Sequence, residues 1–260
     1  MTLACAIVLA GSHGITRFIR VKGEILMPLV SSPRVLARFI GLFHLIVIVG
    51  GVVAQGLISN RLVVFSSAAT TATNILANRQ LFQLSFTIFL IEMAANVATT
   101  TLFYELMRPV SKSVSLLSTG WGLTGCIIKT FARAFYIVPL WVLAGTSALS
   151  AFNSEQLQSI ALVLLRVNGQ GANIALPFFG LEWVLRGYLM MRSTYLPRWL
   201  GVLSFISGLG WLTYFYPPFG SRLFLILALI ALATAGALIF WLLVFGVNEE
   251  RWKEQATTSS

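Results

Sequence analysis

The chain has 260 residues, of which 57% are hydrophobic and only 10% are charged. Soluble domains usually carry about 25% charged residues, so this composition excludes an ordinary soluble fold and points to membrane-spanning helices. The net charge of +10 does not indicate a nucleic-acid partner, because the basic residues lie between apolar stretches and no zinc-ligand spacing or RNA-binding signature accompanies them.

Residues 1–32 are predicted to form an N-terminal tail outside the membrane domain. Residues 1–11 are apolar, but they are too short to cross a bilayer and lack the basic region that begins a signal peptide. Two interpretations stay open for this tail: a flexible or interfacial segment, or a translation start at Met27. Ser32 and Pro33 then form the pattern of a helix N-cap followed by proline at the first helical position.

Six apolar stretches follow, each close to the 20 or so residues that cross about 30 Å of hydrocarbon. They cover residues 38–59, 81–107, 117–143, 171–191, 199–216 and 222–247, and the fifth is near the lower limit of length. Backbone groups in lipid must bond within their own segment, so these stretches are predicted to be helices. The expected fold class is therefore all-α: a polytopic membrane helix bundle of about six transmembrane helices within residues 33–247, with a polar C-terminal tail at 248–260.

Two further segments are too short to cross a membrane. Residues 67–77 begin with a capping serine and are small and polar, whereas residues 155–167 have a polar head and an apolar body. Both are predicted to be short interfacial helices at the membrane surface. The sequence PPFGS at 217–221 predicts a tight turn between the fifth and sixth spans.

Lysine and arginine outside the spans predict the orientation. With the N-terminus in the cytoplasm, eleven of these residues lie inside and four lie outside. We therefore expect a multi-pass protein of the cell inner membrane with both termini cytoplasmic and membrane lipids as partners. Arg192 and Arg198 flank the connection between the fourth and fifth spans and are predicted to contact lipid headgroups; the simpler interpretation is that they only fix the topology.

The stretch FFGLEWVLRGYLMMRSTYLPRWLGVLSFISGLG, residues 178–210, resembles the signature of a bacterial membrane family named domain of unknown function 4386. The positions that carry the resemblance are Phe179, Gly180, Gly187, Tyr188, Arg192, Ser193, Leu196, Pro197, Gly201, Gly208 and Gly210. ARFIGLFHLIVIVGG at 37–51 and the region around Asn74 also resemble it. The resemblance extends over about residues 33–247. It implies a multi-span membrane protein but no activity and no catalytic residue.

Five charged residues lie well inside the predicted spans, away from the span ends. Glu92 is central in the second span, Lys129 and Arg133 lie four residues apart in the third, and Glu182 and Arg186 lie four apart in the fourth, in the favoured order of a helical ion pair. Each charge alone would cost about 3 kcal/mol at the membrane centre. Counted from the span ends, Glu92, Lys129 and Glu182 lie at nearly the same depth. The sequence therefore predicts one polar cluster among three neighbouring helices, with charges that compensate one another.

His44 in the first span and Asn96, one turn from Glu92, are possible additional members of this cluster. Intramembrane ionisable residues favour a functional site, here for binding or transport of a small polar or anionic solute or of a lipid headgroup. The alternative is a structural or regulatory membrane protein whose buried ion pairs only hold the bundle together.

No catalytic residue, metal site or cofactor is expected. The chain has no GxSxG nucleophile elbow, no HExxH motif and no phosphate-binding loop, and it contains no aspartate from which to build a metal cluster. The oligomeric state does not follow from the sequence, because small residues spaced four apart suit helix packing within a chain or between chains.

Overall fold

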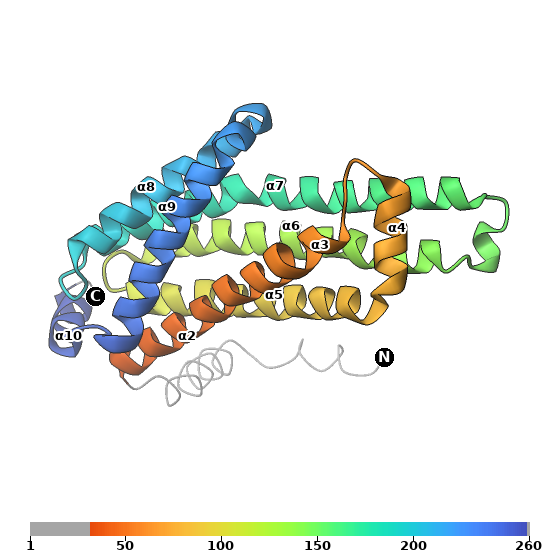
Figure 1. Ribbon diagram of the computed structural model, residues 1–260. Helices are drawn as coiled ribbons and strands as arrows, with labels where there is room; N and C mark the ends of the chain where they lie inside the picture. The colour runs from red at the N-terminus through yellow and green to blue at the C-terminus, as the bar shows by residue number, and fades with distance from the viewer. Residues whose placement is uncertain (1–31, 259–260) are drawn as a thin grey trace, which may run out of the picture.

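The computed structural model describes residues 32–258, and these residues form helices and short connections without any β-strand (Figure 1). The predictions for residues 1–31 lie outside the described residues. Ser32 is the N-cap of the first described helix, and its side chain accepts a hydrogen bond from the Val35 amide, as the Ser-Pro pattern predicts. In the described part, five helices are long and apolar enough to cross a membrane. This confirms an all-α bundle of the membrane type.

The long elements follow one another in antiparallel order. They are α2 (Pro33–Gly51), continued by the π-helix η2 (Val52–Ser59) and α3 (Asn60–Leu62), then α5 (Arg79–Met107), α6 (Lys112–Leu143), α7 (Ser154–Arg192), α8 (Arg198–Leu212) and α9 (Pro217–Val244). The short elements are α4 (Ala68–Ala77), the 3-10 turns η3 (Ser147–Leu149) and η4 (Thr213–Phe215), and α10 (Glu249–Thr258). The predicted short helix at 67–77 is thus confirmed as α4, with Ser67 as its N-cap.

Three helices, α5, α6 and α7, run side by side through the centre of the bundle (Figure 1). Against them pack α2, which contacts α5, and α8, which returns along α7. The last long helix, α9, contacts both α8 and α2. Helix α4 lies across the central helices rather than along them, beside the start of α5, and α6 and α7 extend beyond it (Figure 1).

The prediction of a separate interfacial helix at 155–167 is wrong, because α7 is one continuous helix of 39 residues. Asn153 begins it with a capping box that pairs Asn153 and Gln156. Gly171 lies in the middle of this helix, where a glycine weakens helical propensity. Its position is held by packing on α6, since a Cβ at Gly171 would lie 2.5 Å from the Ala132 Cβ. Tertiary contact therefore outweighs the local signal that suggested a break.

The predicted fifth span forms the shortest of the long helices. Helix α8 has 15 residues and the 3-10 turn η4 adds three, which gives about 22 Å plus about 6 Å of length. It is not among the five helices that meet the length criterion. The turn predicted at 217–221 is also wrong: Pro217 is already the first residue of α9, because proline at this position has the helical φ and needs no hydrogen-bond partner.

Glycines bring α7 and α8 into backbone contact. A Cβ at Gly187 would lie 2.5 Å from the Phe205 amide nitrogen, and one at Gly208 would lie 2.6 Å from the Val184 amide nitrogen. A Cβ at Gly201 would lie 2.7 Å from the carbonyl oxygen of Gly187. Small residues allow such close approach between membrane helices. The hairpin of α7 and α8 is therefore a rigid unit whose spacing depends on these glycines.

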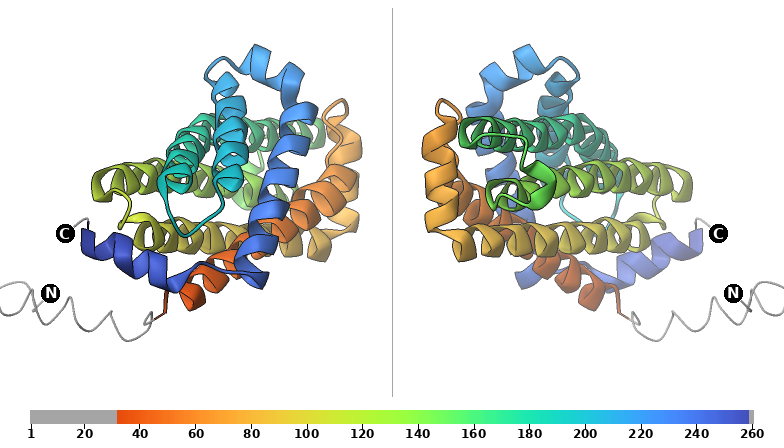
Figure 2. Two further views of the ribbon diagram at one scale, coloured as in Figure 1. Left: turned by 90° about the vertical axis from the view of Figure 1, so that its left-hand side faces the viewer. Right: turned by 90° about the vertical axis from the view of Figure 1, so that its right-hand side faces the viewer.

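Both described ends of the chain lie at one end of the bundle, onto which the left view of Figure 2 looks. Helix α10 packs there across the start of α2 and the end of α5. Ser32 Oγ donates a hydrogen bond of 2.5 Å to Glu249 Oε1, and the Trp252 indole donates one of 3.0 Å to the Leu106 carbonyl oxygen. Tyr195, between α7 and α8, donates a bond of 2.6 Å to the same carbonyl.

The contact of Glu249 predicts that acid releases α10. The hydrogen bond from Ser32, and to a smaller extent Arg34, lowers the pKa of the Glu249 carboxyl from its ordinary value of 4.5. The stability that this contact contributes is therefore present above pH 4.5 and is lost as the pH falls through the lowered pKa. We expect amide hydrogen exchange in 249–258, corrected for intrinsic rate, to accelerate over that range. In Glu249→Gln this acceleration should be absent. An acceleration in Glu249→Gln equal to that of the wild type would contradict the assignment.

Candidate functional site

The charged residues inside the bundle lie between two apolar cores. One core lies near the end that carries α10 and includes Phe103, Leu106 and Leu200. The other lies toward the opposite end and includes Phe82, Phe89 and Tyr136. Charges between two such cores are removed from water, so each one needs a partner within the protein.

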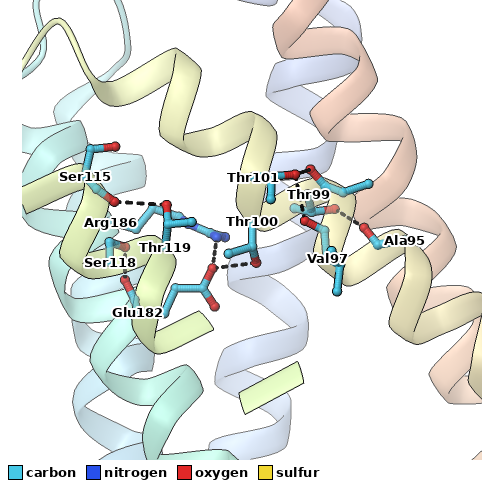
Figure 3. A network of polar contacts seen from close by, with 11 residues as sticks. Ala95, Val97, Thr99, Thr100, Thr101, Ser115, Ser118, Thr119, Glu182 and Arg186 are labelled. Carbon is cyan, nitrogen blue, oxygen red and sulfur yellow. Dashed lines mark hydrogen bonds and ion pairs between the residues drawn. The ribbon is translucent and has the colours of Figure 1, made fainter. Parts of the chain in front are cut away.

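Glu182 and Arg186 form an ion pair four residues apart on α7 (Figure 3). The pair is almost fully buried, with 1% of Glu182 and 3% of Arg186 exposed. Thr100 on α5 donates a hydrogen bond of 2.9 Å to Glu182 Oε1, and Ser118 on α6 donates one of 3.0 Å to the Glu182 carbonyl oxygen. The three central helices thus meet at Glu182.

Packing around this pair leaves little space. A Cβ at Gly122 would lie 2.6 Å from Glu182 Oε1, so α6 can approach the carboxylate only with glycine at this position. The Arg186 guanidinium lies over the Phe103 ring, 4.0 Å from its centroid, which adds a cation–π contact. A space of about 10 Å³ borders Arg186, which holds about one water at most.

Glu92 and Lys129 form a second ion pair, between α5 and α6. The Lys129 ammonium donates a hydrogen bond of 2.6 Å to Glu92 Oε1. Glu92 is 3% exposed, and its second oxygen, Oε2, accepts no hydrogen bond from the described residues. Helix α2 lies against the same carboxylate, because a Cβ at Gly51 would be in ordinary van der Waals contact with Oε1, at 3.7 Å.

Arg133 differs from the other two cations. Within the described residues no carboxylate lies within ion-pair distance of it. Its Nη1 donates a hydrogen bond of 3.1 Å to Asn168 Oδ1, and its guanidinium lies 3.5 Å from the centroid of the Phe89 ring. Sequence reasoning missed Asn168, because it falls in the part of α7 that was not expected to lie in the bundle. It also missed Phe89, because a phenylalanine in an apolar span gives no signal of a contact with a cation.

The five charged residues do not lie at one depth. Thr100, which binds Glu182, lies eight residues beyond Glu92 on α5, and this separation amounts to about 12 Å along the helix. The predicted single cluster is instead two ion pairs at two levels. The reason is that α7 is longer than the predicted fourth span. Depths counted from the ends of the predicted spans therefore misplace the residues of α7 relative to those of α5 and α6.

A cleft of about 310 Å³ lies beside the Glu92–Lys129 pair. Its walls come from α2, η2, α5, α6, α7, α8 and α9. The polar residues that line it are Glu92, Lys129, His44, Asn96 and Ser207. The apolar walls include Phe179, Trp183, Trp211 and small residues of α9 such as Ala231. The cleft therefore combines a charged end with an apolar body.

The cleft lies between α2 and α9. These helices touch near the α10 end, where a Cβ at Gly41 would lie 3.0 Å from the Leu243 side chain. Away from that contact the two helices diverge (Figure 1). Residues of both helices that lie farther from the α10 end therefore line the cleft without closing it. The rim residues Val52, Phe224 and Leu232 are each about half exposed. Because these residues lie within the apolar part of their helices, the rim faces the surface that lipid would cover.

Several buried polar atoms of residues that line the cleft have no protein partner among the described residues. They are both ring nitrogens of His44, Ser207 Oγ and Glu92 Oε2. His44 is 4% exposed and contacts Trp183, at 5.5 Å between ring centroids. Asn96, the other additional residue that the sequence suggests, lies on the cleft wall. Sequence reasoning missed Ser207, because a serine on an apolar helix gives no signal of its own.

The remaining predicted residues lie elsewhere. Arg192 and Arg198 are exposed at the α10 end of the bundle and take no part in the cleft. Arg133 does not line the cleft either. Within residues 32–258, no group of three His, Cys, Asp or Glu side chains could hold a metal ion.

The fold and these buried pairs define a class: a polytopic helical bundle of the membrane type, with charged residues in its interior. The chain belongs to the family "Domain of unknown function (DUF4386)", which matches residues 39–246. The expected resemblance is thereby confirmed. The four glycines at the α7–α8 contact, Gly180, Gly187, Gly201 and Gly208, are among the positions that carry it, so this part of the signature reflects helix packing.

A relative from Archaeoglobus fulgidus, described as an uncharacterized protein, is 31% identical over 125 residues. The match covers 48% of this chain and 60% of the relative, so it spans less than two thirds of that protein. No solved structure matches the chain.

Proposed function

We propose that the cleft between α2 and α9 is a binding site for a small polar or amphipathic ligand in a cell-membrane protein. The observation that carries the proposal is a 310 Å³ cleft whose lining residues Glu92 and His44 carry buried polar atoms, Glu92 Oε2 and both His44 nitrogens, that have no hydrogen-bond partner among residues 32–258. A buried polar group without a hydrogen bond costs about 1–3 kcal/mol. A ligand that satisfied several of these groups would recover that free energy on binding.

The two ion pairs have different roles in this proposal. Glu182 and Arg186 neutralise each other inside dense packing, which favours a structural role. Glu92 and Lys129 line the cleft, and Lys129 keeps 21% of its side chain exposed. The structural alternative is therefore favoured for the first pair and ligand binding for the second.

The proposed orientation places the α10 end of the bundle at the cytoplasmic face of the inner membrane. Arg192 and Arg198 are exposed at this end, as is the Arg108 side chain with its Glu105 partner. Each basic residue near an anionic membrane surface contributes about 1 kcal/mol. The cleft would then lie deep within the bilayer, since Glu92 lies near the middle of α5.

Mass spectrometry of small molecules that co-purify with the protein in mild detergent tests the binding proposal. Ala231 lines the cleft, whereas Ala233 is exposed on another side of α9. We expect a bound molecule in the wild type and in Ala233→Phe, and its loss in Ala231→Phe, which fills the cleft without changing any charge. The same molecule should also be lost in Glu92→Gln.

Thermal unfolding of each variant provides the control for folding. An equal load of bound molecule in all four proteins, or none in any of them, would contradict a binding cleft. That outcome would favour the alternative in which both ion pairs only stabilise the bundle.

A further inference from the structure

We infer that the ligand of this cleft is a neutral amphiphile with a hydroxyl head, which enters from the bilayer between α2 and α9. The inference rests on the proposed function and specifies the chemical class of the ligand and its route. It departs from the anionic ligand that the excess of basic residues suggests.

The charge balance of the cleft favours a neutral head. Lys129 is the one cation among the lining residues, and it is already paired with Glu92 at 2.6 Å. The other two buried cations do not line the cleft: Arg186 is paired with Glu182, and Arg133 contacts Asn168 and the Phe89 ring. An ionised amine or carboxylate bound beside a neutralised pair would leave an uncompensated charge inside the membrane, which is unfavourable.

The polar atoms without a hydrogen-bond partner favour a ligand group that both donates and accepts hydrogen bonds. Glu92 Oε2 can only accept, and the Lys129 ammonium can only donate. A neutral His44 offers one donor and one acceptor, and Ser207 Oγ offers both. A hydroxyl group matches this mixture, because it can donate to Glu92 while it accepts from Lys129 or His44.

The rest of the cleft suits the apolar part of a ligand. The aromatic rings of Phe179, Trp183 and Trp211 form one wall, and the small side chains Ala228 and Ala231 leave room on the other. The half-exposed rim lies on η2 and α9 at the apolar surface of the bundle. An alkyl or isoprenoid chain can therefore leave the cleft sideways into the acyl chains, whereas a water-soluble molecule would have no apolar part to match these walls.

Photo-crosslinking with three matched probes tests this inference. The probes are hexadecanol, hexadecanoic acid and hexadecylamine, each with a diazirine at the same carbon and a terminal alkyne, added to the full-length protein in phosphatidylcholine nanodiscs. For the alcohol, we expect labelling of peptides from residues 224–235 to fall at least threefold in Ala231→Phe and in Glu92→Gln, but not in Ala233→Phe. For the acid and the amine, labelling should be the same in the wild type, Ala231→Phe and Ala233→Phe, because it reports only contact with the lipid-facing surface.

The outcomes distinguish an error in the ligand class or its route from an error in the binding site itself. Labelling by the acid or the amine that falls in Ala231→Phe would overturn the neutral head while leaving a binding cleft in place. If no probe gives labelling sensitive to Ala231→Phe, but a co-purified molecule is still lost in that variant, entry from the bilayer is wrong and the binding site stands. If neither experiment responds to Ala231→Phe, both the ligand class and the binding site are wrong.

Discussion

Replacing Glu182 by alanine is expected to lower the free energy of unfolding by about 3–5 kcal/mol, because the change leaves the Arg186 guanidinium buried without a counter-charge. It also removes the acceptor of the Thr100 hydrogen bond. Reversible unfolding in detergent or bicelles measures the change. The effect is expected to be large because only 1% of Glu182 is exposed, so water cannot replace the lost partner.

Glu105→Ala is the matched control for Glu182→Ala. It breaks another glutamate–arginine pair, with Arg108 at 3.1 Å, but both side chains of that pair are 41% exposed. Exposed pairs contribute about 0–1 kcal/mol. A further test is the double change of Glu182 to leucine and Arg186 to methionine, which should recover most of the lost stability because no unpaired charge remains. Equal effects of Glu182→Ala and Glu105→Ala would contradict the buried pair.

Gly187→Ala is the second change with a large expected effect. The new Cβ would lie 2.5 Å from the Phe205 amide nitrogen and 2.7 Å from the Gly201 carbonyl oxygen. Both neighbours are backbone atoms of α8, so no side-chain rotation can relieve the clash and the two helices must separate. We expect a loss of about 2–3 kcal/mol, measured by the same unfolding experiment.

Gly169→Ala is the matched control on the same helix. No heavy atom lies within 4 Å of the position that its Cβ would occupy. Alanine is the better helix former by about 0.5–1 kcal/mol, so this variant should be as stable as the wild type or slightly more so. A destabilisation of Gly169→Ala as large as that of Gly187→Ala would mean that α7 needs flexible glycines rather than a close approach to α8.

Much of the candidate site could be predicted from residue types and spacing. A charge within an apolar helix must find a partner, and the i,i+4 order of Glu182 and Arg186 already identifies one pair. The pairing of Glu92 with Lys129 also agrees with their equal expected depth. The partners of Arg133 could not be predicted, because Asn168 lies between the predicted segments and an aromatic ring in an apolar helix carries no signal of a contact with a cation.

The sequence by itself determined that the chain is an all-α bundle of the membrane type, because hydrophobic length and the need for internal backbone hydrogen bonds leave little other choice. It also determined where helices begin at Ser32 and Ser67, since capping residues act locally. Only the tertiary structure decided how the helices are offset along the bundle. The single helix α7, the two levels of ion pairs and the divergence of α2 from α9 all follow from side-chain packing between helices, and no one segment contains that information.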